Sequence, residues 1–483
     1  MSRFFLTTTL PYVNAQPHMG HALEFIQADF LARWLKFRYG ADNVRFNVGT
    51  DEHGQKIRQK AHEAGLSVSD FVSQNVATFV DFCSSFGIGY DSFYRTSLLS
   101  HYPVAQTLRN EVKKNGLLGK KTYGGNYCLG CELFKKDKDL VNGECPDHPG
   151  QKLVQMEEEN YFFLMSHLRD RLLAWFDAHP DFLYPKSKRE ELRNYLLDLE
   201  DLSISRRRET LNRGVPVPDD DDHVMYVWFD ALSNYIGACG YPDPSFVDWR
   251  SQSIQFCGPD NLRFQGGIWQ AMLEAIGAPH TYKLLVHGTV FGPDGNKMSK
   301  TLGNVISPFE MKNRYGVDAV RLYVLAGIPT YGNASFVPAD MVALHNAWLC
   351  DTLGNLINRV LVLGKKYGTD LGDGTALTNQ EWARAWADGE KVIEDAMGEY
   401  DLYRACHGIH TLGLWANKVF DNSKPRDRIL SKEERTAILR DSYTVIVRLC
   451  QLYEPVIPAG MARCFGIVRG KEPQIPFVKI EGK

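Results

Sequence analysis

The sequence predicts an α/β protein in which a split, Rossmann-like parallel sheet is followed by an all-α helical bundle. Three observations support this fold class. Strand-like and helix-like segments alternate near the N-terminus, which is typical of βαβ units. The alternation stops between about residues 116 and 150, where Gly, Lys and Cys are frequent, and it resumes near residue 224. Strand signals end at about residue 339, and long helical patterns follow.

The first half of the sheet is expected over residues 1–115. β-Forming residues are concentrated at Phe4–Leu10 and Val44–Val48, so each of these segments is expected to be a strand. Apolar residues recur at helical spacing over Ala22–Arg38 and Gln55–Ala64, which predicts a helix after each strand.

The remaining chain is expected to form four regions. Residues 116–223 form an insertion, and residues 224–290 form the second half of the sheet, with strands at Val224–Trp228, Ile254–Cys257 and Tyr282–Val286. Residues 291–338 hold a loop that contains lysines. Residues 339–483 form an all-α domain of four or five helices, with helical patterns at 341–366, 379–398, 400–420 and 431–452.

Composition excludes several classes of protein. The 483 residues include 55 Lys and Arg against 58 Asp and Glu, which gives a net charge of -3. A uniformly basic protein is therefore excluded, and any contact with nucleic acid must come from a local basic surface. We expect no membrane partner, since the sequence has no apolar run of about 18 residues. The N-terminus shows no signal peptide, so we expect a cytoplasmic protein whose ten cysteines are reduced thiols or metal ligands.

Two histidines lie between the first expected strand and the first expected helix, in Pro17-His18-Met19-Gly20-His21. A helix N-terminus presents N–H groups to an anion, and Gly20 lets a ligand approach the backbone. Two imidazoles three residues apart can both donate to phosphate oxygens, where negative charge grows in a transition state. The alternative, that the histidines are solvated or cap the helix, is equally probable on this motif alone.

Two lysines occur in Lys297-Met298-Ser299-Lys300-Thr301, within a Gly-rich stretch. They can neutralise charge on a polyphosphate and on a pyrophosphate leaving group. Taken alone, the motif is better explained as a solvated basic loop. Its position at the far end of the same split sheet makes it the expected second half of a nucleotide site.

The insertion contains four potential metal ligands, Cys128, Cys131, Cys145 and His148. Two pairs, each with two residues between its members, are typical of a closed tetrahedral zinc site. The sequence therefore predicts a structural Zn2+ in a zinc knuckle, and scattered cysteines are the weaker alternative.

These motifs resemble those of the class I aminoacyl-tRNA synthetases, whose signatures are His-x-Gly-His and Lys-Met-Ser-Lys-Ser. Thr301 replaces the last serine and keeps its hydroxyl. Within the class the sequence is most similar to the methionyl-tRNA synthetases of the single zinc-knuckle subtype. Further matching segments are Leu10–Asn14, Gly49–Gly54, Asp201–Arg206, Tyr226–Ala231 and the C-terminal helices.

The resemblance implies activation of L-methionine by ATP and Mg2+ to methionyl-adenylate, followed by transfer to the 3′ end of tRNA(Met). It implies that His18, Gly20 and His21 bind ATP together with Lys297, Ser299 and Lys300, and that the two histidines and two lysines are catalytic. Residues 291–338 would then also contact the tRNA stem. Arg206 is expected either to contact the phosphates or to tie the insertion to the sheet.

The resemblance also implies an amino-acid pocket. Asp51 would hold the substrate ammonium, and the walls would be Leu10, Tyr12, Trp228, Tyr235 and Gln265. For each wall residue taken singly, core packing is the alternative. The pocket departs from the family pattern, because Pro259 stands where lysine is usual, Gln265 where histidine is usual and Gln270 where proline is usual.

On the anticodon side, Asn355 and Arg359 match the family's Asn-x3-Arg on one helix face, where both side chains could read an unstacked base. A solvated helix face is the alternative. Arg426 follows Pro425 where the family usually has tryptophan, and either its guanidinium or Trp415 could stack on a base.

Two other functions remain open at this point. One is a related adenylate-forming enzyme that activates another amino acid, which Pro259 and Gln265 motivate. The other is a tRNA-binding protein without catalysis, which the intact phosphate-binding motifs disfavour. We expect a monomer, because the further dimerising domain of many relatives does not follow the helices.

Overall fold

The computed structural model describes residues 3–481, except 129–132, 136–139, 147–148, 212, 297 and 299–303. The chain divides into two compact units. The first unit comprises Met1–Gln16, Arg38–Asp81 and Tyr90–Val286, and the second comprises Pro17–Phe37, Phe82–Gly89 and His287–Lys483. Both units are thus assembled from segments that lie far apart in the sequence.

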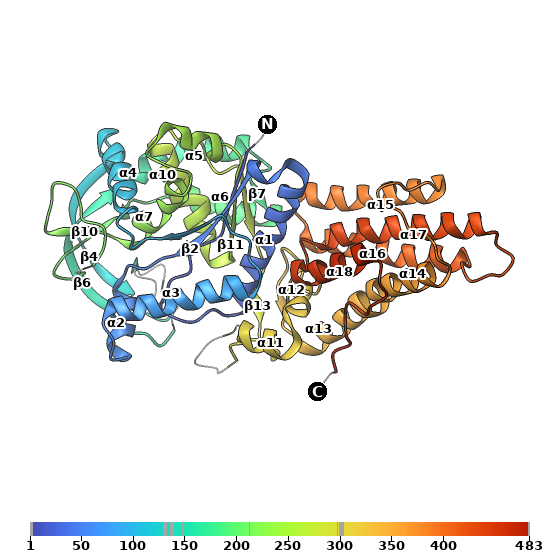
Figure 1. Ribbon diagram of the computed structural model, residues 1–483. Coiled ribbons are helices and arrows are strands. Elements are labelled where there is room, and N and C mark those ends of the chain that lie inside the picture. The colour runs from blue at the N-terminus through green and yellow to red at the C-terminus, as the bar shows by residue number, and fades with distance from the viewer. Residues whose placement is uncertain are drawn as a thin grey trace. The chain divides into compact units, whose positions relative to one another are not determined.

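A six-stranded parallel sheet is the framework of the first unit (Figure 1). Its order is β3-β2-β1-β11-β12-β7, and each pair of neighbours is parallel. The side chains of β1 and β11 are all buried, as expected for central strands covered on both faces. The predicted parallel sheet is confirmed. Its strands are β1 (Phe4–Thr7), β2 (Val44–Thr50), β3 (Ser92–Arg95), β7 (Leu183–Tyr184), β11 (Ser253–Cys257) and β12 (Lys283–Val286).

The direction in which the strands follow one another reverses between β1 and β11. In open α/β sheets, ligands bind at the carboxyl ends of the strands beside such a reversal. The segments that follow β1, β2 and β11 are therefore the expected place for a binding pocket.

Two apolar clusters contain side chains from the helices of this unit. The larger joins Leu108, Leu172, Leu192 and Met272 of four helices to Leu284 of β12. The smaller contains residues of α2 and α3. The helices are α2 (Gln55–Glu63), α3 (Val68–Ser85, which continues into the second unit), α4 (Tyr102–Lys114), α5 (Arg169–Ala178), α6 (Arg189–Leu197), α7 (Val227–Leu232), α8 (Asn234–Gly237), α9 (Val247–Arg250) and α10 (Trp269–Ala275).

The insertion is mainly antiparallel. Its four-stranded sheet has the order β5-β4-β6-β8, and β9 pairs with β10. Arg206 is buried in β9 with its guanidinium 3.8 Å from the ring centre of Tyr226 and close to Tyr127, so it ties the insertion together. The strands are β4 (Leu118–Cys128), β5 (Leu133–Lys135), β6 (Val154–Phe163), β8 (Leu202–Ser203), β9 (Ser205–Arg207) and β10 (His223–Met225).

The expectation of a parallel strand at Val224–Trp228 is wrong. Only His223–Met225 is a strand, and it pairs antiparallel with β9. The chain then becomes helical at Val227, which brings Phe229 against Phe163 in the core. Periodicity alone cannot separate a short buried strand from a short buried helix.

The second unit contains α1 and the C-terminal helices, and α14 to α17 run side by side (Figure 1). The predicted helical C-terminal region is confirmed. Side chains of Asn379, Asp401 and Ser431 cap α15, α16 and α17. The elements are α1 (Met19–Tyr39, whose last two residues belong to the first unit), β13 (Val290–Phe291), α11 (Pro308–Tyr315), α12 (Val317–Ala326), β14 (Ala334–Ser335), α13 (Pro338–His345), a π-helical stretch (Asn346–Gly354), α14 (Asn355–Lys366), α15 (Gln380–Gly398), α16 (Leu402–Asn422), α17 (Lys432–Tyr453) and α18 (Pro458–Gly470).

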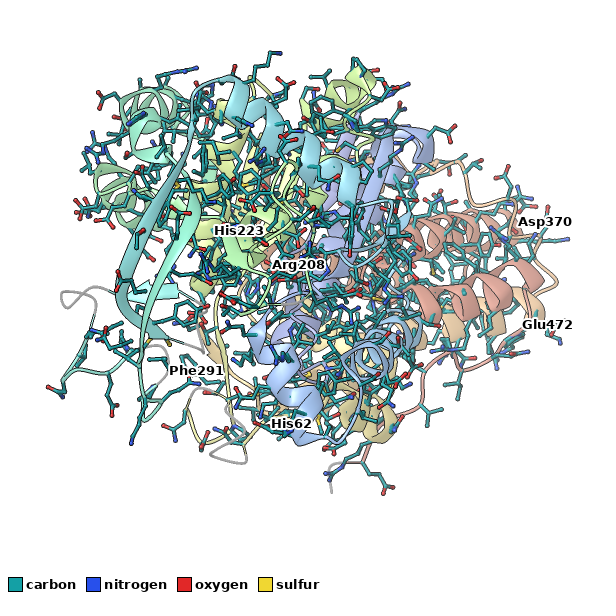
Figure 2. All side chains as sticks on the ribbon, turned by 90° about the vertical axis from the view of Figure 1, so that its left-hand side faces the viewer. His62, Arg208, His223, Phe291, Asp370 and Glu472 are labelled. Carbon is teal, nitrogen blue, oxygen red and sulfur yellow. The ribbon has the colours of Figure 1, made fainter. Side chains whose placement is uncertain are left out.

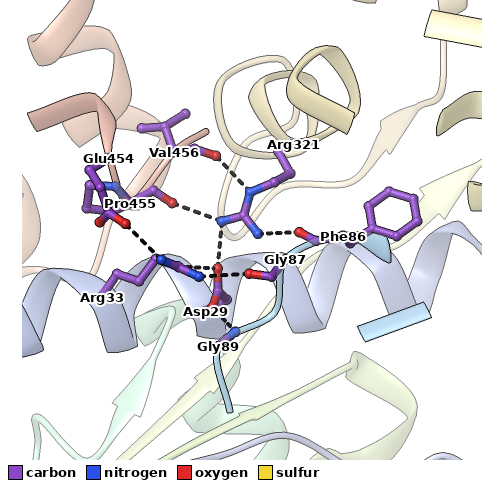
Figure 3. A network of polar contacts seen from close by, with 9 residues as sticks. All are labelled: Asp29, Arg33, Phe86, Gly87, Gly89, Arg321, Glu454, Pro455 and Val456. Atoms are coloured by element: carbon purple, nitrogen blue, oxygen red, sulfur yellow. Dashed lines mark hydrogen bonds and ion pairs between the residues drawn. The ribbon is translucent and has the colours of Figure 1, made fainter. Parts of the chain in front are cut away.

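A buried ionic network joins α1 to the end of α17 within this unit (Figure 3). Arg321 of α12 donates to Asp29 of α1 over 2.6 Å and to the carbonyl oxygens of Phe86, Pro455 and Val456, each over 2.9 Å. Asp29 also accepts from the Gly89 N–H over 2.7 Å. Arg321 and Asp29 are each 1% exposed, so the pair is shielded from water.

None of the helices in the described part of the chain combines the length and the apolar character needed to cross a bilayer.

Candidate active site

The two motif histidines lie at the start of α1 in the second unit. Their rings are stacked, with centres 3.8 Å apart and planes 24° apart. Nδ1 of His18 accepts from the Gly20 N–H over 3.1 Å, and Nδ1 of His21 accepts from the His18 N–H over 3.2 Å. Because each Nδ1 is an acceptor, each neutral ring carries its proton on Nε2. Both imidazoles can therefore donate through Nε2–H.

His21 is held neutral by its surroundings. Burial, followed by the nearby His18 and His287, places the pKa of His21 well below its ordinary value. At neutral pH the ring is thus a hydrogen-bond donor without a positive charge. Such donors at a helix N-terminus suit the oxygens of a phosphoryl group.

Gly20 is required by the position of the His18 ring. A Cβ at residue 20 would lie 2.9 Å from His18 Cε1 and 3.0 Å from Nδ1. Any side chain here would move the imidazole from its backbone donor.

The three lysine-motif residues of the predicted nucleotide site, Lys297, Ser299 and Lys300, lie outside the described residues. The chain just after them is described, and the Ile306 carbonyl accepts from the Met19 N–H over 3.3 Å. On both sides of the motif, Asn296 and Asn304 donate to the Asp294 carboxylate. The segment that follows the lysine motif therefore contacts the start of α1.

The predicted ammonium-binding residue lies in the first unit, where β2 ends. Asp51 is 5% exposed and forms a parallel bridge with Tyr12 beyond the end of β1. Its N–H donates to the Pro11 carbonyl over 2.9 Å, and its carbonyl accepts from the Val13 N–H over 3.2 Å. The structure thus brings Asp51 and Tyr12 together, and Leu10, which lies between β1 and Tyr12 in the sequence, is buried.

Close to Asp51 in the sequence, His53 belongs to a buried group of polar side chains whose role the sequence did not reveal. His53 Nδ1 and His101 Nε2 each lie 2.5 Å from an oxygen of Asp230, and all three side chains are fully buried. Burial raises the pKa of Asp230, but the two histidines outweigh this effect and hold it at about 2. The ionised carboxylate therefore accepts from both rings. It fixes α7, which carries Trp228, against the segment that follows Asp51.

A second buried carboxylate fixes the same segment. Glu52 accepts from Arg95 Nε over 2.8 Å and from Arg95 Nη2 over 2.9 Å. It also accepts from the hydroxyls of Thr50 and Ser97. A bidentate Arg–carboxylate pair is geometrically specific, so it holds the Asp51 backbone in place.

The other predicted pocket residues form an aromatic group. Trp228 stacks on Phe264 with ring centres 3.7 Å apart, and Tyr235 lies edge-on to Trp269 at 5.5 Å. Gln265 is buried and donates from Nε2 to the Tyr235 hydroxyl over 2.7 Å. Gln265 thus contacts Tyr235 directly, and Trp228 contacts Phe264, the residue that precedes Gln265.

Comparison with known proteins shows which family has this sequence and fold. The family model of class I tRNA synthetases (M) matches residues 4–155 and 148–361. A methionine–tRNA ligase of Caldanaerobacter subterraneus subsp. tengcongensis is 36% identical over 438 residues, 89% of this chain and 67% of its own. One from Thermosynechococcus vestitus is 36% identical over 479 residues, which cover 96% and 89% of the two chains.

The chain belongs to the class I methionyl-tRNA synthetase family. The enzymes of this family activate methionine with ATP and join it to tRNA. A solved structure of the Mycobacterium tuberculosis methionyl-tRNA synthetase in complex with methionyl-adenylate is similar, with a TM-score of 0.88 and 30% identity. The match covers 97% of this chain and 94% of that one.

Two of the four zinc ligands predicted from the spacing of the sequence are described. Cys128, at the end of β4, and Cys145 are both 0% exposed. Cys131 and His148 lie outside the described residues, and no group of three potential ligands occurs among the residues that are described. Two fully buried thiols in a region with little apolar core fit a closed structural site.

The predicted anticodon-binding side chains gather near the start of α14 and the end of α16. Asn355 is exposed on α14, and Arg359, one turn later, pairs with Asp421 of α16. Arg426 is exposed in the loop that follows. Arg435 of α17 donates to the Pro425 carbonyl over 3.1 Å and orders this loop. Trp415 instead packs against Trp382 and Trp386.

Proposed function

We propose that the residues named above each perform a part of the two-step reaction that this family catalyses. In the first step the methionine carboxylate attacks the α-phosphorus of ATP, and the bond to pyrophosphate breaks. In the second step a terminal ribose hydroxyl of tRNA attacks the methionyl carbonyl, and AMP leaves. The observation that carries this proposal is the stacked histidine pair, in which each Nδ1 accepts a backbone N–H, so that the ring hydrogen is on Nε2.

In the first step, His18 and His21 would donate to the α-phosphoryl oxygens as charge grows on them. No protein nucleophile is required, because the substrate carboxylate attacks, and catalysis is mainly positioning and charge stabilisation. Lys297, Ser299 and Lys300 would hold the pyrophosphate. Mg2+ would arrive with ATP and neutralise part of its charge. The hydrogen bond between Met19 and Ile306 supports a shared role for the two motifs.

Methionine would be bound by the pocket of the first unit. Asp51 would pair with the ammonium group, since it is a nearly buried carboxylate that Glu52 and the neighbouring backbone hold in place. The walls formed by Leu10, Tyr12 and the aromatic group suit a thioether, because aromatic rings make favourable contacts with sulfur.

Binding of the tRNA anticodon would fall to the helical residues 339–483. Asn355 offers an amide to a base edge, and the exposed guanidinium of Arg426 offers a plane for stacking. Arg359 would contact a base either after its ion pair with Asp421 has broken or while that ion pair is kept. Arg435 fixes the loop that presents Arg426 by donating hydrogen bonds to its carbonyl oxygens. This supports a surface that is ordered before tRNA binds.

ATP–pyrophosphate exchange with each of the twenty amino acids tests the proposed substrate. We expect methionine to exceed leucine by about 100-fold in kcat/KM, because a pocket matched to a side chain gains this much from shape and polarity. Exchange with another amino acid but not with methionine would instead identify the related adenylate-forming enzyme. Binding of tRNA without any exchange would identify the protein without catalysis.

We further propose the single zinc-knuckle subtype, in which Cys128, Cys131, Cys145 and His148 hold a structural Zn2+ in the insertion 116–223. The metal would order the insertion and supply no chemistry to the reaction. The two buried thiols support this proposal. We also propose a cytoplasmic monomer, which light scattering would test.

Replacing Cys145 by serine is expected to lower bound zinc from about one ion per chain to nearly none, because structural sites need all four ligands. Transfer to tRNA should fall by about 10-fold or more, whereas pyrophosphate exchange should change by less than about 3-fold. Elemental analysis and both assays measure these effects. Cys350→Ser, a change at a half-buried thiol on another part of the chain, is the matched control. Full zinc content in Cys145→Ser would exclude the site.

A further inference from the structure

Residues 476–480, called the tail segment below, contact the π-helical stretch Asn346–Gly354 that precedes α14. The Asn346 side chain makes two hydrogen bonds to the backbone of one tail residue. Its Nδ2 donates to the Ile480 carbonyl over 2.9 Å, and its Oδ1 accepts from the Ile480 N–H over 2.9 Å. Because one amide pairs with both polar groups of the same residue, this contact fixes the position and the direction of the tail segment.

The tail segment also contacts the middle and the end of the π-helical stretch. Lys479 Nζ donates to the Asp351 carboxylate over 2.9 Å. A Cβ at Gly354 would lie 3.4 Å from Pro476 Cγ and 3.5 Å from Phe477 Cδ2, so both tail residues pack on the backbone there. Phe477 is buried. The tail segment therefore holds the stretch along its whole length.

Helix α16 holds the same stretch through other side chains. Trp348 stacks on His410 with ring centres 4.0 Å apart and planes 3° apart. Asn417 Nδ2 donates to the Thr352 carbonyl over 3.1 Å. The Thr352 hydroxyl donates to the carbonyl of Ala347, five residues earlier, over 2.8 Å, which is the spacing of a π-helix. The stretch thus has fixed partners both on α16 and on the tail segment.

The π-helical stretch determines which side chains of α14 face outward. A π-helix bonds residues five apart rather than four, so each turn contains more residues than an α-helical turn. Since α14 continues the stretch without a break in helical backbone, any change in this number turns the faces of α14 relative to α13. In the structure Ile357 is buried and Asn355 is exposed. A stretch that became α-helical would point both in other directions.

We propose that Asn346 and the tail segment are positioning elements for tRNA binding, because they hold the π-helical stretch and thereby the face of α14 that carries Asn355 and Arg359. The inference rests on the proposed anticodon-binding role of α14 and adds the part of the chain that orients this helix. π-Helical turns are rare and occur frequently at functional sites. Here the stretch lies directly before the proposed anticodon-binding residues.

Asn346→Ala tests the proposal, because it removes both hydrogen bonds to Ile480. The full-length enzyme is assayed by aminoacylation of tRNA(Met) and by pyrophosphate exchange without tRNA. We expect KM for tRNA to rise about 5-fold, the order of effect that follows from losing one or two hydrogen bonds. KM for methionine and for ATP should change by less than about 2-fold, because neither substrate is proposed to contact α14.

A double variant tests whether Asn346 acts through α14. Asn355→Ala alone should raise KM for tRNA, since it removes a proposed contact with a base. In Asn346→Ala with Asn355→Ala, the rise should be smaller than the product of the two single rises, because the second change acts on a contact that the first has already lost. Thr444→Val removes a buried hydroxyl of α17 that donates to the Ala376 carbonyl, and it is the control for a general loss of stability. It should leave KM for tRNA unchanged.

An unchanged KM for tRNA in Asn346→Ala, or equal losses in aminoacylation and exchange, would overturn the inference. Single effects that multiply in the double variant would do the same, since Asn346 would then act independently of α14. Failure of the proposed anticodon role would appear separately, as a wild-type KM for tRNA in Asn355→Ala.

Discussion

His21→Ala is expected to lower kcat for adenylate formation by about 100- to 1000-fold, the usual effect of removing one preorganised donor from a developing charge. KM for methionine should change by less than about 2-fold, because the ring is proposed to act on the α-phosphoryl group. The His21 Nδ1 accepts from the His18 N–H, so its Nε2–H has a fixed direction before substrate binds. Single-turnover measurement of methionyl-adenylate gives the rate directly.

Two further variants make this test specific. Gly20→Ala leaves both histidines in place but puts a methyl group 2.9 Å from His18 Cε1, so it should lower kcat by about 10-fold or more. His62→Ala removes an exposed histidine of α2 (Figure 2) and should have no effect. A His21→Ala enzyme with wild-type kcat would remove the histidine pair from the mechanism.

Arg321→Leu is expected to lower the free energy of unfolding of the second unit by about 3 kcal/mol, because Asp29 then keeps only Arg33 as an ion-pair partner and buried carbonyl oxygens lose their donor. Asp29 would lose the guanidinium 2.6 Å away, and three carbonyl oxygens would lose a donor. Denaturant unfolding followed by tryptophan fluorescence measures the change.

The exposed pair of Arg404 and Glu399 provides the comparison, and Arg404→Leu should cost less than about 1 kcal/mol. The double variant Asp29→Leu with Arg321→Leu should recover part of the loss, because the buried carboxylate is then removed together with its buried partner, and Arg33 keeps Glu454. Equal effects of the two arginine variants would show that the buried network does not stabilise the unit.

The helices of residues 339–483 could be predicted well from the sequence. Their apolar spacing is regular, and local side chains mark where they begin. Ser431, for example, accepts from the Glu434 N–H over 3.1 Å, while the Glu434 carboxylate accepts from the Ser431 N–H over 2.8 Å. Strand β7 escaped prediction because two residues carry no periodic signal, and β3 because its four residues are only half-buried and include Ser92 and Arg95. The segment Val224–Trp228 was predicted to be a strand because its residues are mostly apolar. A short buried helix has the same apolar composition, and α7 begins at Val227.

The candidate site also contains residues that short sequence motifs indicate and contacts between residues that lie far apart in the chain. The histidine motif follows from a short sequence pattern, and Asp51 and Tyr12 were expected from the resemblance to the family. The contact of His53 with Asp230 joins residues 177 positions apart, and that of Thr281 with Gln255 joins residues 26 positions apart. Such pairings depend on the strand order of the sheet, which no local pattern contains.

The network around Arg321 also sets the order in which this protein can mature during its synthesis. Asp29 is synthesised 292 residues before Arg321, and two of the carbonyls that hold the Arg321 guanidinium come 134 and 135 residues after it. The helix that follows His18 and carries His21 therefore gains its full set of contacts only after Val456 has been synthesised. A nascent chain released before Pro455 would hold Arg321 with Asp29 and Phe86 but without two of its carbonyl acceptors, so such products should be more open to proteases.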